Sequence, residues 1–174
     1  MRTRDMTRVA LMAALLCVAG PLTVAIGPIP LSLATFTVYL AGAVLGPKRG
    51  TLAVALYLLI GSVGVPVFSG FSGGVQKLAG VTGGYLVGYL ACAALTGLGV
   101  DDARPSAWRL AGMMVVGTIA LYAVGTAWFM LQTKNPIGAA LGMCVLPFLP
   151  GDAVKIAAAT VVSPTIRRAV QWTK

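Results

Sequence analysis

The sequence predicts an all-α membrane protein, with six transmembrane helices in a compact bundle and residues 1–174 forming a single domain. Three observations lead to this prediction. Hydrophobic residues make up 58% of the chain and charged residues only 10%, whereas soluble domains carry about 25% charged residues. The apolar residues form long runs that are separated by Gly, Pro and charged residues. The basic residues gather in alternate breaks between these runs, which is the charge bias of membrane proteins.

The first three apolar runs predict three helices, at about 7–26, 31–45 and 51–65. Gly46-Pro47 closes the second run and Pro66 follows the third, and proline cannot continue a helix because it lacks an N–H group. The second and third runs are shorter than the roughly 20 residues that span a bilayer. Tilted helices or a locally thin bilayer would accommodate them. A cleaved signal peptide is the alternative for the first run, but apolar segments continue along the whole chain.

The second half of the chain predicts three more membrane helices. A glycine-rich loop at 69–74 precedes a fourth run at about 78–98, and a fifth run covers about 108–131. The last region, 136–164, is interrupted at Pro147 and Pro150. We interpret it as a short helical piece followed by the sixth spanning helix.

The distribution of basic residues predicts the orientation. Six spans place both termini, which are basic, on one side, together with the loops around Lys48 and Arg104. All but three of the 13 Lys and Arg residues then lie on that side, and the exceptions are Lys77, Lys134 and Lys155. Because Lys and Arg accumulate in cytoplasmic loops, we expect cytoplasmic termini and a multi-pass protein of the bacterial inner or plasma membrane. No basic stripe follows a single element, so the net charge of +9 does not indicate nucleic-acid binding.

Several absences argue against catalysis. The sequence contains no His, and its three cysteines do not have metal-ligand spacing, so neither a metal site nor a cofactor is expected. It also lacks the glycine-rich phosphate loop that ends in Gly-Lys-Ser/Thr, so the chain should not hydrolyse ATP. We therefore expect a protein that is not an enzyme.

Asp152 and Lys155 are the strongest candidates for ligand contacts. They stand three residues apart, and so share one face of a helix, near the start of the sixth span. Ionisable residues within a membrane segment are functional candidates by default. Together they would suit a small polar anion, and the long Gly- and Pro-rich outer loops predict a pocket that opens outward. The alternative is structural: Asp152 caps the helix after Pro150-Gly151 and pairs with Lys155.

Small residues repeat every fourth position along two of the predicted helices. Gly80, Gly84 and Gly88 have this spacing in the fourth run, which favours close helix packing. The functional alternative is that Gly83, Gly84 and the following Tyr85 bring bare backbone and one phenol to a ligand. Ala10 and Ala14 form a similar pair in the first helix, which is weak on its own.

The ordered motifs along nearly the whole chain resemble the BioY family, the biotin-binding S components of energy-coupling factor (ECF) transporters. The motifs are Gly27-Pro28-Ile29-Pro30-Leu31-Ser32-Leu33, Leu40-Ala41-Gly42, Leu45-Gly46-Pro47, Leu58-Leu59-Ile60-Gly61, Gly64-Val65-Pro66-Val67-Phe68, Thr82-Gly83-Gly84-Tyr85-Leu86 with Gly88, Gly125 with Trp128, and Pro147-Phe148-Leu149-Pro150-Gly151-Asp152-Ala153-Val154-Lys155. The last string is the most specific.

The resemblance implies six helices and a biotin pocket near the outer face, with the Asp and Lys of the final string contacting the vitamin. The expected substrate-binding residues are Asp152, Lys155, Tyr85, Gly84, Gly83, Phe36 and Gln76, and Phe68 is a further apolar wall. Which end of biotin meets Asp152 and which meets Lys155 is left open.

The resemblance also implies partners: a transmembrane coupling subunit and two ATPase subunits, besides the surrounding lipid. Ala10 and Ala14 match the small-residue motif that the family is proposed to use against the coupling subunit. A homo-oligomer, and transport without the coupling module, are left open.

Two positions depart from the family pattern. Ala34 stands where many members have Gln, so a polar contact to the ligand is expected to be either missing or replaced, and Val81 stands where many have Pro. Lys77 is also unusual, and it is interpreted either as a solvated loop lysine or as a cation for the ligand carboxylate. The alternative functions are an S component for another small vitamin and a membrane assembly or chaperone subunit without a ligand.

Overall fold

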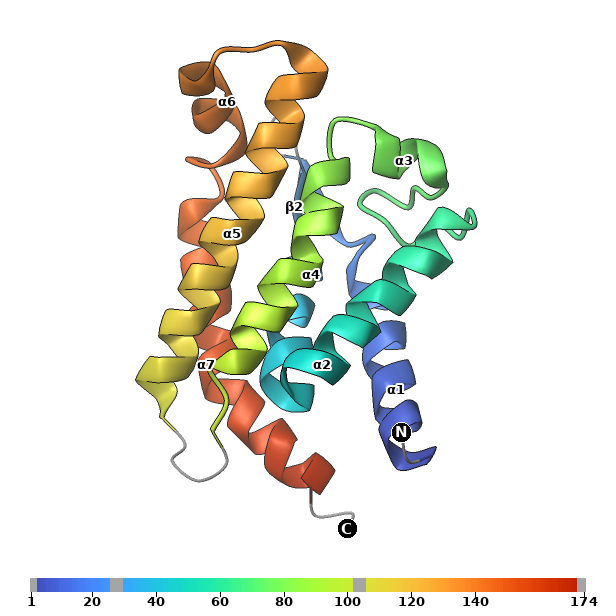
Figure 1. Cartoon of the computed structure of the whole chain (residues 1–174), viewed down its shortest axis with the longest axis vertical. Coiled ribbons are helices and arrows are strands. Elements are labelled where there is room, and N and C mark those ends of the chain that lie inside the picture. Colours follow the sequence, from blue (N-terminus) through green and yellow to red (C-terminus); the bar gives the residue numbers. More distant parts are fainter. Residues whose placement is uncertain (1–2, 26–29, 102–105, 172–174) are drawn as a thin grey trace.

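The computed structural model describes residues 3–25, 30–101 and 106–171, and in this part of the chain the fold is a bundle of helices (Figure 1). The elements are α1 (Thr3–Ala19), β1 (Thr23–Ala25), β2 (Pro30–Ser32), α2 (Ala34–Ser62), α3 (Val75–Ala79), α4 (Gly83–Leu98), α5 (Ala107–Thr133), α6 (Ile137–Cys144) and α7 (Leu149–Gln171). The prediction of an all-α membrane fold is confirmed, with one small hairpin added to it.

The first helix is shorter than predicted. The sequence predicts a helix over about 7–26, whereas α1 ends at Ala19. The strands β1 and β2 then pair as an antiparallel hairpin, with Thr23 opposite Ser32. Gly20-Pro21 explains this end, because proline cannot donate to the preceding helical turn. Gly20 also packs closely against the backbone of Val67, since a Cβ on Gly20 would lie 2.4 Å from the Val67 carbonyl oxygen. The end of the predicted helix, Ile26, lies outside the described residues.

The second and third predicted helices are the two arms of α2. They meet at Gly46, whose φ of 79° and ψ of 178° are non-helical, a conformation essentially restricted to glycine. Pro47 follows as the first residue of the second arm, where its missing N–H group has no cost. The arms fold back on one another and approach closely at Gly50, where an added Cβ would lie 2.5 Å from the Ala41 carbonyl oxygen. The predicted break is therefore a helical elbow rather than a loop.

The central helix is α4, which packs against both α2 and α5 (Figure 1). It begins at Gly83, and the first residues of the predicted 78–98 helix belong to the separate short helix α3 and the following turn. The α4 glycines are packing residues: a Cβ on Gly84 would lie 2.2 Å from the Trp128 Cβ, and one on Gly88 would lie 2.8 Å from a methyl of Leu121. Bare backbone thus lets α4 approach α5 closely.

The remaining helices follow the sequence prediction with extended ends. Ser106 caps α5, where its side chain accepts a hydrogen bond from the Arg109 N–H. The α6 and α7 helices are bent by 50° relative to each other, and α7 continues past Pro164 to Gln171. In the described residues α2 and α5 are long and apolar enough to cross a membrane, the bent α6–α7 pair is a third candidate, and α4 is a shorter apolar helix. With α1 and the two arms of α2, this arrangement is compatible with six spans.

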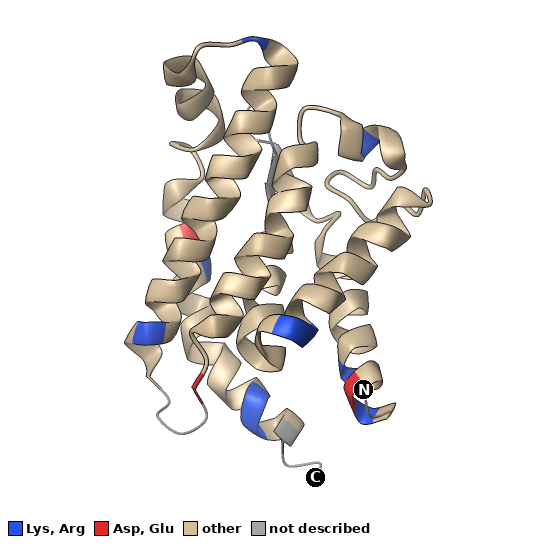
Figure 2. Cartoon of the chain, viewed as in Figure 1, with Lys and Arg blue, Asp and Glu red and all other residues tan. Residues whose placement is uncertain are grey.

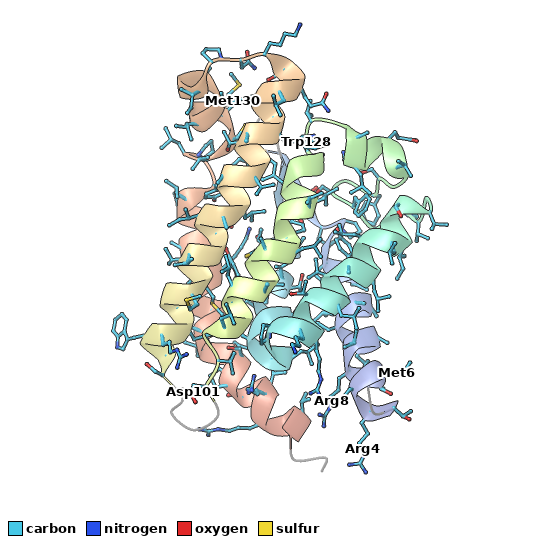
Figure 3. All side chains as sticks on the ribbon, in the orientation of Figure 1. Arg4, Met6, Arg8, Asp101, Trp128 and Met130 are labelled. Carbon is cyan, nitrogen blue, oxygen red and sulfur yellow. The ribbon has the colours of Figure 1, made fainter. Side chains whose placement is uncertain are left out.

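Charge is distributed unevenly along the bundle axis. Figure 2 shows most Lys and Arg segments at the end of the bundle where α1 begins and α7 ends, which we call the basic end. Figure 3 places Arg4, Arg8 and Asp101 at this end, and Trp128 and Met130 toward the other. Ion pairs help to order the basic end, with Arg49 to Asp5 and Arg109 to Asp101 each at 2.8 Å.

Candidate binding site

A cavity lies in the half of the bundle away from the basic end, where α3, α6 and the hairpin meet the long helices (Figure 1). Its volume is about 50 Å³, enough for a few water molecules at roughly 10–15 Å³ each. Its lining residues, most of them polar or aromatic, come from almost every element: Ser32, Thr35, Phe68, Ser69, Lys77, Thr82, Tyr85, Leu86, Tyr89, Leu121, Tyr122, Cys144, Phe148, Asp152 and Lys155.

The two charged residues predicted to bind a ligand meet in this cavity. Lys155 Nζ lies 3.0 Å from Asp152 Oδ1, and the side chains are 11% and 6% exposed. Asp152 is in the first turn of α7, where the positive end of the helix dipole stabilises a carboxylate. A buried pair of this kind costs desolvation of both charges, so removing either partner is strongly destabilising.

Hydrogen bonds also connect the Asp152–Lys155 pair to three other elements. Lys155 Nζ donates to the Ser32 carbonyl oxygen and to Thr35 Oγ1, both at 2.8 Å. With Asp152 these acceptors use all three ammonium hydrogens. The carboxylate of Asp152 accepts from the Tyr122 hydroxyl and lies 3.4 Å from Thr35 Oγ1. The network therefore joins α7 to β2, to the start of α2 and to α5.

Local sequence explains why these groups converge. Ser32 ends β2, and its hydroxyl accepts from the Ala34 N–H at 2.9 Å and donates to the Gly20 carbonyl at 3.0 Å. These bonds fix the start of α2 beside the end of α1, which leaves the Ser32 carbonyl facing Lys155. On the other side, the break between α6 and α7 places Asp152 at the cavity, with its N–H bonded to the Phe148 carbonyl at 2.8 Å.

Aromatic side chains form the apolar wall of the cavity. Tyr85 and Tyr89 from α4, Phe68 and Phe148 are each less than one-tenth exposed. The Tyr85 hydroxyl is 3.1 Å from Thr126 Oγ1, so its polar tip has a partner within the protein. An ion pair on one side and aromatic rings on the other can hold a small ligand with a polar head and an apolar body.

The structure brings together some of the predicted substrate-binding residues and separates others. Asp152, Lys155 and Tyr85 line the cavity, as does Phe68. Gly83 and Gly84 are buried in packing contacts, since a Cβ on Gly83 would lie 1.7 Å from the Leu78 carbonyl oxygen. Phe36 is half-buried against the core and Gln76 is exposed on α3. Ligand contact by each of these residues, including those that line the cavity, remains a prediction.

Thr35, Tyr122 and Ser32 are site residues that the sequence did not predict. Thr35 and Tyr122 are polar groups inside apolar helices, which is the only local signal that they carry. Lys77 lines the cavity from α3, which favours the interpretation of this residue as a cation for the ligand carboxylate.

Comparison with known sequences decides the family. The sequence model of the BioY family matches residues 1–172. The chain belongs to the BioY family. The BioY resemblance of the ordered motifs is therefore confirmed.

Curated relatives cover the same length as this BioY chain. It is 38% identical over 167 residues to the probable biotin transporter BioY of Pyrococcus horikoshii. The aligned region covers 96% of this chain and 98% of the relative. It is 37% identical over 166 residues to the biotin transporter BioY of Thermotoga maritima, covering 95% and 96%.

The fold also matches a solved structure. The S-component for biotin from an ECF-type ABC transporter superposes with a TM-score of 0.86 at 26% sequence identity, and the match covers 96% of this BioY chain and 92% of that one.

Proposed function

We propose that this BioY chain is the biotin-binding S component of an ECF-type vitamin uptake transporter. It binds extracellular biotin within the membrane and passes it inward with energy from partner ATPases. The protein itself is not an enzyme. The cavity beside the Asp152–Lys155 pair carries the proposal, because it combines buried charges with aromatic walls in a chain whose relatives are named biotin transporters.

The chemistry of biotin suits this cavity. Its ureido ring presents N–H donors and a carbonyl acceptor, and its tail ends in a carboxylate. Asp152 accepts N–H bonds, whereas Lys155 donates to a carbonyl or carboxylate. The fused rings and aliphatic chain need apolar walls, which Tyr85, Tyr89 and Phe68 supply. Lys77 offers a second cation at the α3 side of the cavity.

Ligand binding requires side chains to move. The cavity of about 50 Å³ is too small for a bicyclic vitamin, and the three ammonium hydrogens of Lys155 are already taken by Ser32, Thr35 and Asp152. When biotin binds, the cavity therefore widens, and an acceptor atom of biotin replaces one of these three partners of Lys155. Such an exchange keeps the buried charges paired in both states.

The exposed face of α1 is the proposed contact with the coupling subunit. Ala10 and Ala14 are exposed, while Val9, Ala13 and Leu16 point into the core. Small residues on an outward face let another helix approach closely. The basic end, with the start of α1 and the end of α7, is proposed to be cytoplasmic by the bias of Lys and Arg.

Titration of biotin against the detergent-purified chain tests the function directly. Saturable binding of biotin is expected, with Lys134→Ala as a control that binds like the parent, because Lys134 is exposed at the C-terminal end of α5 and does not line the cavity. Binding of another vitamin in its place would give an S component of different specificity. Absence of any vitamin binding by folded protein would point to an assembly subunit and overturn the proposal.

A further inference from the structure

A second cavity lies at the basic end of the bundle. Its volume is about 380 Å³, and we call it the basic cavity. Its lining comes from the first arm of α2, the segment that follows α4, the start of α5 and the last turns of α7: Ala43, Gly99, Val100, Asp101, Ser106, Ala107, Leu110, Ser163, Pro164, Arg167 and Arg168. It shares no residue with the candidate biotin cavity.

The polar groups of the basic cavity suit an anion. Two arginines of α7 line it, of which Arg167 donates to the Ala43 and Val44 carbonyl oxygens at 3.0 and 3.3 Å. Asp101, the acidic residue of the lining, is ion-paired with Arg109 at 2.8 Å. Ser163 is 1% exposed, and its hydroxyl has no hydrogen-bond partner among the described residues. Buried hydroxyls in proteins are normally bonded. Ser163 lines the cavity, so its hydroxyl is a candidate donor to an anion there.

An apolar groove runs from the basic cavity along the outside of the bundle. It lies between α5 and α7, has a volume of about 620 Å³ and is lined by Ala107, Trp108, Ala111, Val115, Thr118, Ile119, Tyr122, Leu149, Asp152, Ala153, Ile156, Ala157, Thr160 and Val161. We call it the α5–α7 groove. Ala107 lines both the groove and the basic cavity, so the two adjoin at this residue.

The dimensions of the groove match one membrane leaflet. Along α7 it extends from Leu149 to Val161, which is roughly 18 Å at 1.5 Å per residue. Half of a hydrocarbon core about 30 Å thick is about 15 Å. Trp108 lines the groove at the basic end and is 89% exposed, and exposed tryptophans mark the level of the lipid head groups.

We propose that the basic cavity and the α5–α7 groove form one binding site for an anionic phospholipid of the leaflet that faces the basic end. The phosphate lies beside Arg167 and Arg168, and one acyl chain fills the groove. Charge complementarity at one end and an apolar channel of matching length favour a phospholipid over a protein helix, which would not require the cations. Basic pockets between helices on the cytoplasmic side are suited to such head groups.

Native mass spectrometry of the detergent-purified chain tests this site. The probes are phosphatidylglycerol and phosphatidylcholine with identical acyl chains, and inorganic phosphate as a competitor. We expect phosphatidylglycerol to bind more tightly than phosphatidylcholine. Arg168→Gln should weaken phosphatidylglycerol about fivefold, the factor for one basic residue at a membrane surface. Lys48→Gln removes a charge from the same end outside the cavity and should leave binding unchanged.

Two substitutions in α7 test whether the groove binds the acyl chain. Ala157→Phe fills the groove and should weaken both lipids alike, whereas Val154→Phe enlarges an exposed α7 residue outside the groove and should weaken neither. Equal binding of the two lipids with no effect of Arg168→Gln would overturn the proposal. So would displacement of phosphatidylglycerol by inorganic phosphate, which indicates a free-anion site. Loss of assembly with the coupling subunit in Ala157→Phe while lipid binding persists would assign the groove to a protein helix.

The same variants separate this site from the proposed function. Tyr122 and Asp152 line both the groove and the biotin cavity, whereas Arg168 and Ala157 line only the proposed lipid site. Biotin titration of both variants should therefore match the parent. Failure of lipid binding with biotin binding intact would therefore reject the lipid site alone.

Discussion

Lys155 Nζ donates to Thr35 Oγ1 over 2.8 Å, across a sequence separation of 120 residues. The same hydroxyl lies 3.4 Å from Asp152 Oδ1, so one threonine touches both members of the buried ion pair. Thr35 thereby links the first turn of α2 to α7, and any ligand that draws Lys155 away changes this contact.

Thr35→Val should weaken biotin binding about tenfold, since a hydrogen bond to a charged group contributes roughly 1.5–3 kcal/mol. Calorimetric titration of the purified variant measures the effect. Thr37→Val is the matched control, because the Thr37 hydroxyl bonds to carbonyls of its own helix, at Leu33 and Ala34. Equal affinities for the Thr35 and Thr37 variants would exclude Thr35 from the site.

Lys155→Ala and Asp152→Asn should each weaken biotin binding by about one to two orders of magnitude. Each change removes a contact to the ligand and leaves the other charge unpaired in a low-dielectric site. Titration of well-folded variants provides the measurement, with Lys134→Ala as the control. If both variants bind like the parent, the pair only caps α7 and the site lies elsewhere.

Gly84→Ala should destabilise the protein by about 1–3 kcal/mol, as overpacking usually does. The new Cβ would lie 2.2 Å from the Trp128 Cβ, so α4 and α5 must separate. Thermal unfolding in detergent measures this loss. Gly112→Ala on α5 is the control, because nothing lies within 4 Å of its added Cβ. A lower biotin affinity at unchanged melting temperature would instead support the predicted ligand contact of Gly84.

Replacement of both Ala10 and Ala14 by Trp should abolish assembly with the coupling subunit and spare biotin binding. Both alanines are exposed on α1, and a bulky ring there blocks close helix approach. Co-purification with the coupling subunit and biotin titration report the two properties separately. Ala158→Trp on the exposed face of α7 should preserve assembly. Loss of biotin binding with assembly intact would contradict the proposed role of this face.

Single cysteines in a cysteine-free background test the orientation. Val75→Cys, in the exposed α3, should react with a membrane-impermeant thiol reagent added outside the cell. Lys48→Cys, at the α2 elbow, should react only after the membrane is opened. The expectation follows from the concentration of Lys and Arg at the basic end. Reaction of the Val75 variant only from the cytoplasmic side would invert the topology.

Much of the architecture is encoded locally and could be predicted. The sparse charge, the apolar runs and the placement of Lys and Arg are sufficient for a membrane bundle, because lipid excludes charge from each segment independently of its neighbours. The i,i+3 spacing of Asp152 and Lys155 already places both on one helix face. The ordered motifs are sufficient to recognise the BioY family.

Only the tertiary structure decided which residues share the cavity. Thr35 and Tyr122 reach Asp152 from positions 117 and 30 residues away, and no local pattern encodes such a convergence. The hairpin, the α2 elbow and the packing of Gly84 against Trp128 also depend on contacts between distant segments. Hydrophobic periodicity and charge indicate which faces of a single segment contact lipid or water. A binding site depends instead on how several helices pack together.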